Sequence, residues 1–110
     1  MAYSAELADR IRNKLARRSG VVERKMFGGL GFMIGGNMCC GVDQNELLVR
    51  VPRADFERLI ARPHARAMAF PGRRVTGFVM VAEAGWKDAK SFARWLKIGT
   101  DYAVSLPPKT

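Results

Sequence analysis

Few side chains in the sequence have the types and spacing that catalysis or metal binding needs. The two cysteines are the neighbours Cys39 and Cys40, and the single histidine, His64, lies far along the chain. Zinc-binding thiolates usually lie about two to four residues apart, with further ligands nearby, and this pattern lacks both features. Adjacent strand residues point to opposite faces, which disfavours a disulfide between the two cysteines. We therefore expect two small packing residues, no metal and a reducing compartment.

Pairs of residues for acid–base or nucleophilic catalysis are equally scarce. Asp55 and Glu57 are the nearest approach to a carboxylate pair, but residues two apart on a helix do not face each other. A pairing of either cysteine with His64 has no support from its spacing. We therefore expect no catalytic residues and predict that the chain is not an enzyme.

The glycine-rich run KMFGGLGFMIGGNM, residues 25–38, invites comparison with a phosphate-binding loop. A dinucleotide fingerprint, G-x-G-x-x-G, leads from a strand directly into a helix. Gly29 and Gly31 fit its first two positions, but Ile34 occupies the third, and the following residues read as strand, turn and strand. We expect these glycines to turn the chain and expect no cofactor.

The chain is strongly basic, with a formal net charge of +9. Two basic regions flank the uncharged glycine-rich centre, and together they would attract phosphate polymers. Surface charge that only keeps a small domain in solution is the alternative explanation. The candidate nucleic-acid-binding residues are Arg10, Lys14, Arg17, Arg18, Arg24, Lys25, Arg50, Arg53, Arg73 and Arg74.

Length and composition favour one domain over residues 1–110, because a chain of 110 residues supports one hydrophobic core. No segment approaches the roughly 20 apolar residues of a membrane span. The N-terminal sequence has no uninterrupted apolar stretch of the signal-peptide kind. We expect a cytoplasmic protein that does not enter a membrane.

Hydrophobic periodicity predicts a helix near each end of the chain. The first is expected to begin after Ser4 and to end near Gly20, and the last to begin near Asp88 and to end before Pro107. The first helix should carry an apolar stripe and, beside it, a basic face that consists of Arg10, Lys14, Arg17 and Arg18.

Short apolar runs separated by glycine or polar turn pairs fill the centre of the sequence. Loops this short join antiparallel neighbours, so we expect strands at 22–27, 30–34, 38–42, 47–51, 67–70 and 77–82. A short amphipathic helix is expected between Val51 and Arg62, and residues 83–86 are expected only to connect the last strand to the last helix.

These elements predict an α+β fold with two layers. An antiparallel sheet of about five or six strands would be packed by the N- and C-terminal helices, with the short middle helix beside them. The residues expected in the core are Leu7, Ile11, Leu15, Phe32, Leu48, Phe78, Met80, Phe92, Trp95 and Leu96.

Several of these segments resemble the N-terminal domain of the TfoX/Sxy family. The resemblance covers nearly the whole chain and rests on KMFGG at 25–29, the glycine-rich hairpin after it, LLVRV, RRVTGFVMV, Trp95 and the terminal SLPPK. The motif residues Met26, Phe27, Gly28 and Gly29 are a family signature, and we expect them to pack and to turn the chain.

The resemblance implies a two-layer α+β fold in bacteria and an association with the regulation of natural competence, in which longer members act as transcriptional co-activators. Those members carry a C-terminal helical domain, and because the sequence stops at Thr110 we expect a short standalone member. The resemblance supplies no catalytic residues and no cofactor.

Three functional hypotheses follow. The first is a non-enzymatic regulatory or interaction module that contacts a protein partner whose identity the sequence does not give. The second is direct binding of DNA or RNA through the basic residues, which should weaken steeply with salt. The third is a homodimer formed through a sheet edge. The family resemblance and the missing catalytic set favour the first.

Overall fold

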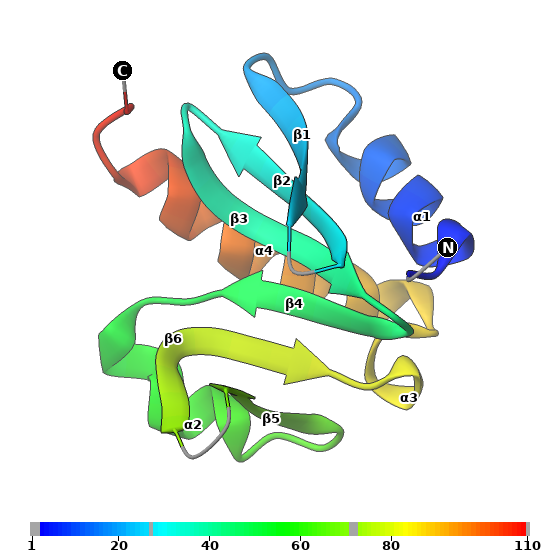
Figure 1. The fold of residues 1–110 in the computed structure, drawn as a ribbon, viewed down its shortest axis with the longest axis vertical. Helices are drawn as coiled ribbons and strands as arrows, with labels where there is room; N and C mark the ends of the chain where they lie inside the picture. Colours follow the sequence, from blue (N-terminus) through cyan, green and yellow to red (C-terminus); the bar gives the residue numbers. More distant parts are fainter. Residues whose placement is uncertain (1–2, 27, 71–72, 110) are drawn as a thin grey trace.

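The computed structural model describes residues 3–26, 28–70 and 73–109. Within these residues, six strands form one sheet, and four α-helices and a 3₁₀ turn accompany it (Figure 1). The helices are α1 (Ala5–Leu15), α2 (Phe56–Ile60), α3 (Glu83–Trp86) and α4 (Ala89–Ser105), and the 3₁₀ turn is Arg53–Asp55. The strands are β1 (Val21–Met26), β2 (Gly29–Ile34), β3 (Asn37–Asp43), β4 (Glu46–Arg50), β5 (Ala65–Phe70) and β6 (Arg73–Val81).

The strand order is β1-β2-β3-β4-β6-β5, and every neighbouring pair is antiparallel. The first four strands form the predicted meander because each turn between them is too short for a parallel crossover. Strand β6 lies between β4 and the edge strand β5, as its largely apolar sequence predicted. The predicted α+β fold, with its sheet of five or six strands and its three helices, is confirmed.

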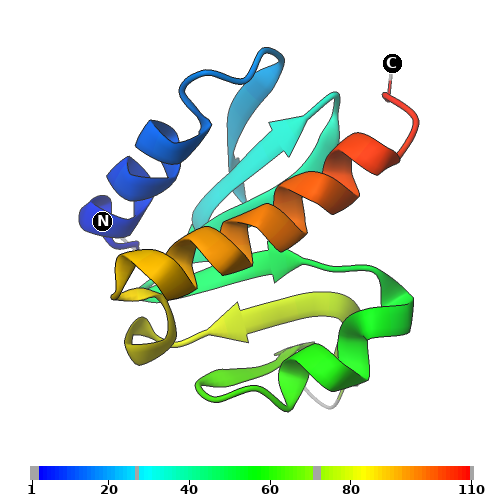
Figure 2. The same cartoon turned by 180° about the vertical axis from the view of Figure 1, so that it is seen from behind.

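Helices α1 and α4 lie on one face of the sheet, and α4 crosses it diagonally (Figure 2). Side chains cap both N-termini as predicted: Ser4 Oγ accepts a hydrogen bond of 3.2 Å from the Leu7 amide, and Asp88 Oδ2 accepts one of 2.9 Å from the Ser91 amide. The main core fills the space between this face and the helices, and the short helix α2 extends it with Phe56 and Leu59.

Nine of the ten predicted core residues are buried, but Phe78 is only half-buried. Trp86, which the sequence did not single out, is fully buried, and its indole Nε1 donates a hydrogen bond of 3.1 Å to the Asn45 carbonyl. Residues 83–86 were expected to be a plain connection and instead form α3. This one-turn helix positions Trp86 beside the N-terminal start of α4.

Helix α1 ends at Leu15, not near Gly20 as predicted. The error has a local cause, because its apolar stripe also ends at Leu15 and no buried residue follows before β1. Arg17 and Arg18 therefore lie beyond the helix, and the basic face predicted for α1 is not formed as a continuous stripe.

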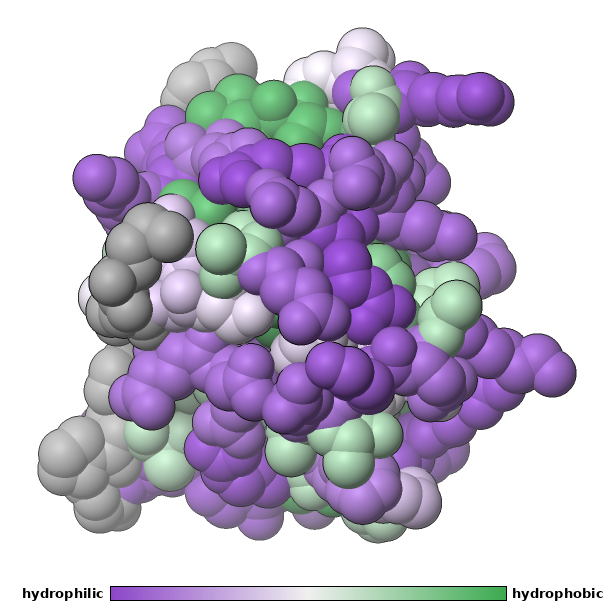
Figure 3. Space-filling model, turned by 90° about the vertical axis from the view of Figure 1, so that its right-hand side faces the viewer, coloured by the Kyte–Doolittle hydropathy of each residue, from purple (hydrophilic) through white to green (hydrophobic). Residues whose placement is uncertain are grey.

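The side of the molecule at the right in Figure 1 is dominated by hydrophilic residues (Figure 3). It includes α1, α3 and the turn between β3 and β4, all of which carry charged side chains. In the described parts of the chain, no helix combines the length and apolar character needed to cross a membrane.

Candidate interaction surface

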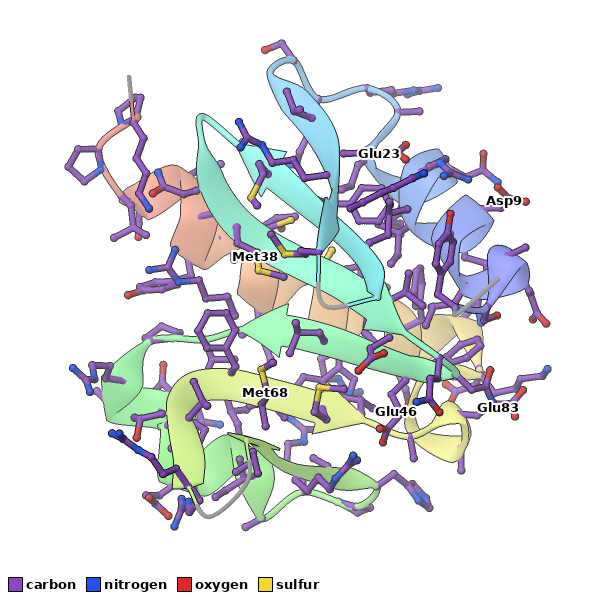
Figure 4. All side chains as sticks on the ribbon, viewed as in Figure 1. Asp9, Glu23, Met38, Glu46, Met68 and Glu83 are labelled. Carbon is purple, nitrogen blue, oxygen red and sulfur yellow. The ribbon has the colours of Figure 1, made fainter. Side chains whose placement is uncertain are left out.

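The sheet face opposite the helices carries most of the methionines. Strand residues alternate between the two faces, so every second residue points away from α1 and α4. On that open face a second apolar cluster forms around three buried residues, Met38, Leu48 and Met80. Half-buried side chains pack against them, namely Met26, Met33, Met68 and Phe78. Figure 4 looks onto this face, with Met38 and Met68 labelled on either side of β4.

Two glycines, one in β2 and one in β3, make room for these methionines. A Cβ atom on Gly31 would lie 2.7 Å from Met26 Sδ, and one on Gly41 would lie 3.2 Å from Met38 Cε. The methionine side chains therefore lie across positions that have no side chain of their own. The glycine-rich run thus does more than turn the chain, because Gly31 and its partner Gly41, paired across β2 and β3, form a low part of the open face.

The cluster borders a groove of ≈360 Å³ that crosses the sheet from the end of β1 to β5. The walls combine methionine and other apolar side chains with two basic ones. The lining residues are Met26, Met33, Gly36, Met38, Leu48, Arg50, Met68, Val75, Phe78 and Lys109. We call this surface the methionine groove. Methionine is flexible and polarizable, and such surfaces adapt to differently shaped apolar partners.

The basic residues Arg50 and Lys109 line the groove, and in the described residues neither forms an ion pair with an acidic side chain. The Arg50 guanidinium lies 5.4 Å from the centre of the Tyr102 ring. The C-terminal segment holds Lys109 in place, because the Lys109 amide donates a hydrogen bond of 2.8 Å to the Gly35 carbonyl. Asn37 Nδ2 donates a second, of 3.0 Å, to the Pro107 carbonyl.

Of the predicted nucleic-acid-binding residues, Arg10 has a structural role. Its Nη1 donates hydrogen bonds of 3.0 and 3.1 Å to the carbonyls of Trp86 and Lys87. Its guanidinium also lies 4.3 Å from the centre of the Phe92 ring. These contacts join α1 to the start of α4, so Arg10 holds helices together and offers little to a ligand.

The other predicted basic residues lie in three separate parts of the protein surface. Lys14 and Arg18 line a depression of ≈300 Å³ between α1 and α4, while Arg17 is exposed. Arg24 and Lys25 are consecutive residues of the edge strand β1 and so point to opposite faces. A third site, a depression of ≈400 Å³, is lined by Arg53, Arg73, Arg74, Val75 and Thr76.

The third site is only partly free to bind an anion. Arg74 Nη2 forms an ion pair of 2.8 Å with Glu57 Oε2, and the Arg74 guanidinium lies 5.2 Å from the Phe56 ring centre. Arg53 and Arg73 are exposed and have no such carboxylate partner among the described residues. The structure therefore brings together three of the ten candidates here, not one continuous basic surface.

The two cysteines lie on the same side of the sheet, contrary to the prediction that they point to opposite faces. A bulge shifts the β2–β3 register so that Met33 pairs with Met38 but Phe32 pairs with Cys40. As a result, Cys39 and Cys40 both lie in the main core, with their Sγ atoms 3.6 Å apart and both thiols free. The contact with Cys39 and burial raise the pKa of the Cys40 thiol well above its ordinary value.

His64 is not brought to the cysteines. It is exposed and lines a different pocket with Arg62, Ser91 and Arg94, whereas both cysteines are fully buried. Asp55 and Glu57 are likewise separated, because Asp55 pairs with Arg58 at 3.3 Å and Glu57 pairs with Arg74. In the described residues, no group of three His, Cys, Asp or Glu side chains has the arrangement of a metal site.

The signature residues lie where β1 turns into β2. Gly28 has φ of +77°, which favours glycine, and a Cβ on Gly29 would collide with the Val42 carbonyl of β3. Met26 packs in the methionine cluster. Phe27 lies outside the described residues. Packing and turning are thus visible roles for the three described members of the signature.

Residues 13–103 match the family model of the TfoX N-terminal domain. The chain belongs to the TfoX N-terminal domain family. No curated protein and no solved structure matched it. The match includes nearly all of this TfoX domain's methionine groove, from Met26 to Phe78, and only Lys109 of the lining lies beyond the matched residues.

Sequence reasoning about this TfoX domain missed the methionine groove. Its residues come from all six strands, the turn between β2 and β3 and the C-terminal segment, and no local motif groups them. One signal was present in the sequence, because five methionines, which have flexible apolar side chains, lie in or beside the predicted strands. They are Met26, Met33, Met38, Met68 and Met80. Only the strand register shows that they share one face.

Proposed function

We propose that this TfoX domain is a non-enzymatic interaction module that binds a protein partner through the methionine groove. The observation that carries the proposal is the groove itself, an apolar, methionine-lined hollow on the sheet face that no described helix covers (Figure 1). Contiguous apolar surfaces of this kind are typical of sites that bind other molecules. The regulatory setting, bacterial competence and transcription, is part of the proposal and comes from the family resemblance, and the cytoplasmic location is proposed from the N-terminal sequence.

The distribution of reactive groups supports a non-enzymatic role. The candidate nucleophiles Cys39 and Cys40 are buried away from His64, and the contact with Cys39 together with burial raises the pKa of the Cys40 thiol, which keeps that thiol protonated. The carboxylates of Asp55 and Glu57 are each paired with an arginine. Among these described residues, no base lies beside a nucleophile, and each carboxylate faces an arginine and not the other carboxylate.

The test is affinity capture from the native cell lysate with two matched variants. Met33→Gln/Met68→Gln makes the groove polar with little change in side-chain length, while Val104→Gln makes the same kind of change on an exposed position of α4. We expect saturable capture of a partner by the unaltered protein and by Val104→Gln, and its loss with the groove variant. Equal capture by all three proteins, or no saturable partner, would contradict the proposal.

Nucleic-acid binding is the alternative function, favoured by the depression that gathers Arg53, Arg73 and Arg74. Fluorescence anisotropy with labelled duplex DNA and single-stranded RNA tests it at several salt concentrations. If this alternative is right, affinity falls steeply with salt and drops in Arg53→Glu/Arg73→Glu. Absence of binding at physiological salt, or binding unchanged by that charge reversal, would exclude these residues as the site.

A further inference from the structure

We propose that the occupant of the methionine groove is an amphipathic helix of a partner protein, with acidic residues beside its apolar stripe. The inference rests on the proposed function and adds the form and charge of the partner segment. Two properties of the groove carry it: the groove runs across the strands of an uncovered sheet face, and its charged lining residues are both basic.

The direction of the groove favours a helix. Its lining runs from Met26 of β1 through β2, β3, β4 and β6 to β5. Neighbouring strands lie about 4.8 Å apart, so five steps span roughly 24 Å. A helix rises 1.5 Å per residue, and about 16 residues would therefore cover this distance. On the opposite face, α4 packs obliquely over β2, β3 and β4, so one face of this sheet already accommodates a helix (Figure 2).

An extended peptide would choose a different place, because it binds by adding a strand to a sheet edge. At the β1 edge such a peptide would meet the exposed, charged run Glu23, Arg24 and Lys25, which protects an edge from added strands. The open face instead offers side chains and not unpaired backbone groups, which suits the apolar stripe of a helix.

The residues that line the methionine groove favour a helix with varied apolar side chains over a single-stranded nucleic acid with stacked bases. Single-stranded nucleic acids stack their bases on aromatic side chains. Among the described lining residues the groove has one aromatic ring, Phe78, and four methionines. Three of these, Met26, Met33 and Met68, are half-buried, so they have room to repack around leucine, isoleucine or phenylalanine of a partner.

The charges select an acidic partner. Arg50 and Lys109 line the groove, and Arg24 lies on the same face of β1, two residues before Met26 of the cluster. A carboxylate at the side of the partner's apolar stripe would meet these cations without competition from a described acidic residue of the lining. A second copy of the chain is disfavoured, because each copy carries a net charge of +9.

The experiment is selection from a displayed library of random peptides of about 16 residues, a length that covers the groove as a helix. Immobilised unaltered protein selects binders, and Met33→Gln/Met68→Gln removes those that do not need the groove. We expect the enriched peptides to carry apolar residues at helical spacing, flanked by Asp or Glu. Enrichment of neutral or basic peptides, or of peptides without helical spacing, would overturn the inference.

A selected peptide is then titrated into the protein while the methionine methyl groups are observed by NMR. We expect shifts at the groove methionines and a loss of affinity of roughly tenfold in Arg50→Glu/Lys109→Glu, because its new carboxylates repel those of the peptide. The matched control is Arg17→Glu/Arg18→Glu, which changes the net charge equally beyond the end of α1 and should bind as the unaltered protein does.

The remaining outcomes separate this inference from the proposed function. Three outcomes would each overturn the acidic helix as occupant. The two charge variants could weaken peptide binding equally, the methyl signals could shift with protein concentration alone, or duplex DNA could shift them. Captured partners that still depend on Met33 and Met68 would then leave the interaction module standing. Failure of both the selection and the groove-dependent capture would overturn both proposals.

Discussion

Gly99→Ala should destabilise the protein, although alanine is the better helix former. Gly99 lies inside α4, where exchange to alanine ordinarily gains up to about 1 kcal/mol. Here the new Cβ would lie closer than 3.0 Å to the Cys39 carbonyl oxygen of β3 and 3.3 Å from Val49 Cγ1. The first of these contacts involves backbone, so no side chain can turn away to relieve it.

The size of the expected loss of stability follows from how little space separates Gly99 of α4 from β3. An ordinary contact between a carbon and a carbonyl oxygen is about 3.3 Å or longer, so α4 must withdraw from β3 by roughly 1 Å. That movement loosens the packing of Trp95 and Leu96 and costs about 1 to 3 kcal/mol, the usual range for overpacking. After the gain in helix propensity, we expect a net loss of about 1 to 2 kcal/mol.

Urea unfolding followed by tryptophan fluorescence measures this change, because Trp86 and Trp95 are both buried in the folded state. A loss of that size should also lower Tm by at least about 4 °C. The variants Val104→Ala and Val104→Gly give the alanine–glycine difference at an exposed position of the same helix. If Gly99→Ala stabilises the protein by this same difference, α4 does not press against β3 and the reasoning fails.

Three further predictions concern packing and charge. Trp95→Ala should lower the unfolding free energy by roughly 3 to 5 kcal/mol, since the ring is 5% exposed; an equally stable variant in urea unfolding would contradict its place in the core. Arg10→Lys should cost about 1 to 2 kcal/mol through loss of the planar contacts with Phe92 and Trp86, and thermal unfolding should show no such cost if those contacts are unimportant. The hydrogen bond from Arg12 lowers the pKa of Glu23 below its usual 4.5. Because the pair is exposed, it should stabilise the folded protein by at most about 1 kcal/mol above that pH. This stabilisation should be lost as the pH falls through the lower folded-state pKa. Glu23→Gln should therefore flatten the stability profile below about pH 4.5, and identical profiles would show that the pair contributes nothing.

Local patterns in the sequence were enough to predict the six strands, α1, α2 and α4 and most of the strand order, but not α3. The alternation of short apolar runs with glycine and polar turns predicted the β1–β4 meander, because such turns permit only antiparallel neighbours. The stripes at helical spacing predicted α1 and α4, together with the caps Ser4 and Asp88. These features depend on residues close together in the chain, so the sequence alone carries them.

The candidate site, in contrast, could not be assembled from the sequence. Met33 and Met68 belong to strands at nearly opposite sides of the sheet, and only the register and the insertion of β6 before β5 place them in one groove. The bulge that turns both cysteines into the core likewise depends on pairing between strands. The structural role of Arg10 was missed for the same reason, because its contacts come from α3 and α4.

The sequence by itself determined the six strands, the helices α1, α2 and α4, the turns of the meander and the positive charge. The elements and turns follow from backbone preference and spacing over a few residues, and the charge follows from composition. Tertiary structure alone decided which face the methionines share, why Gly31, Gly41 and Gly99 lack side chains, and that Arg10 and Arg74 are held by other parts of the protein. Those properties arise from contacts between segments far apart in the chain, and such contacts exist only after the sheet has formed.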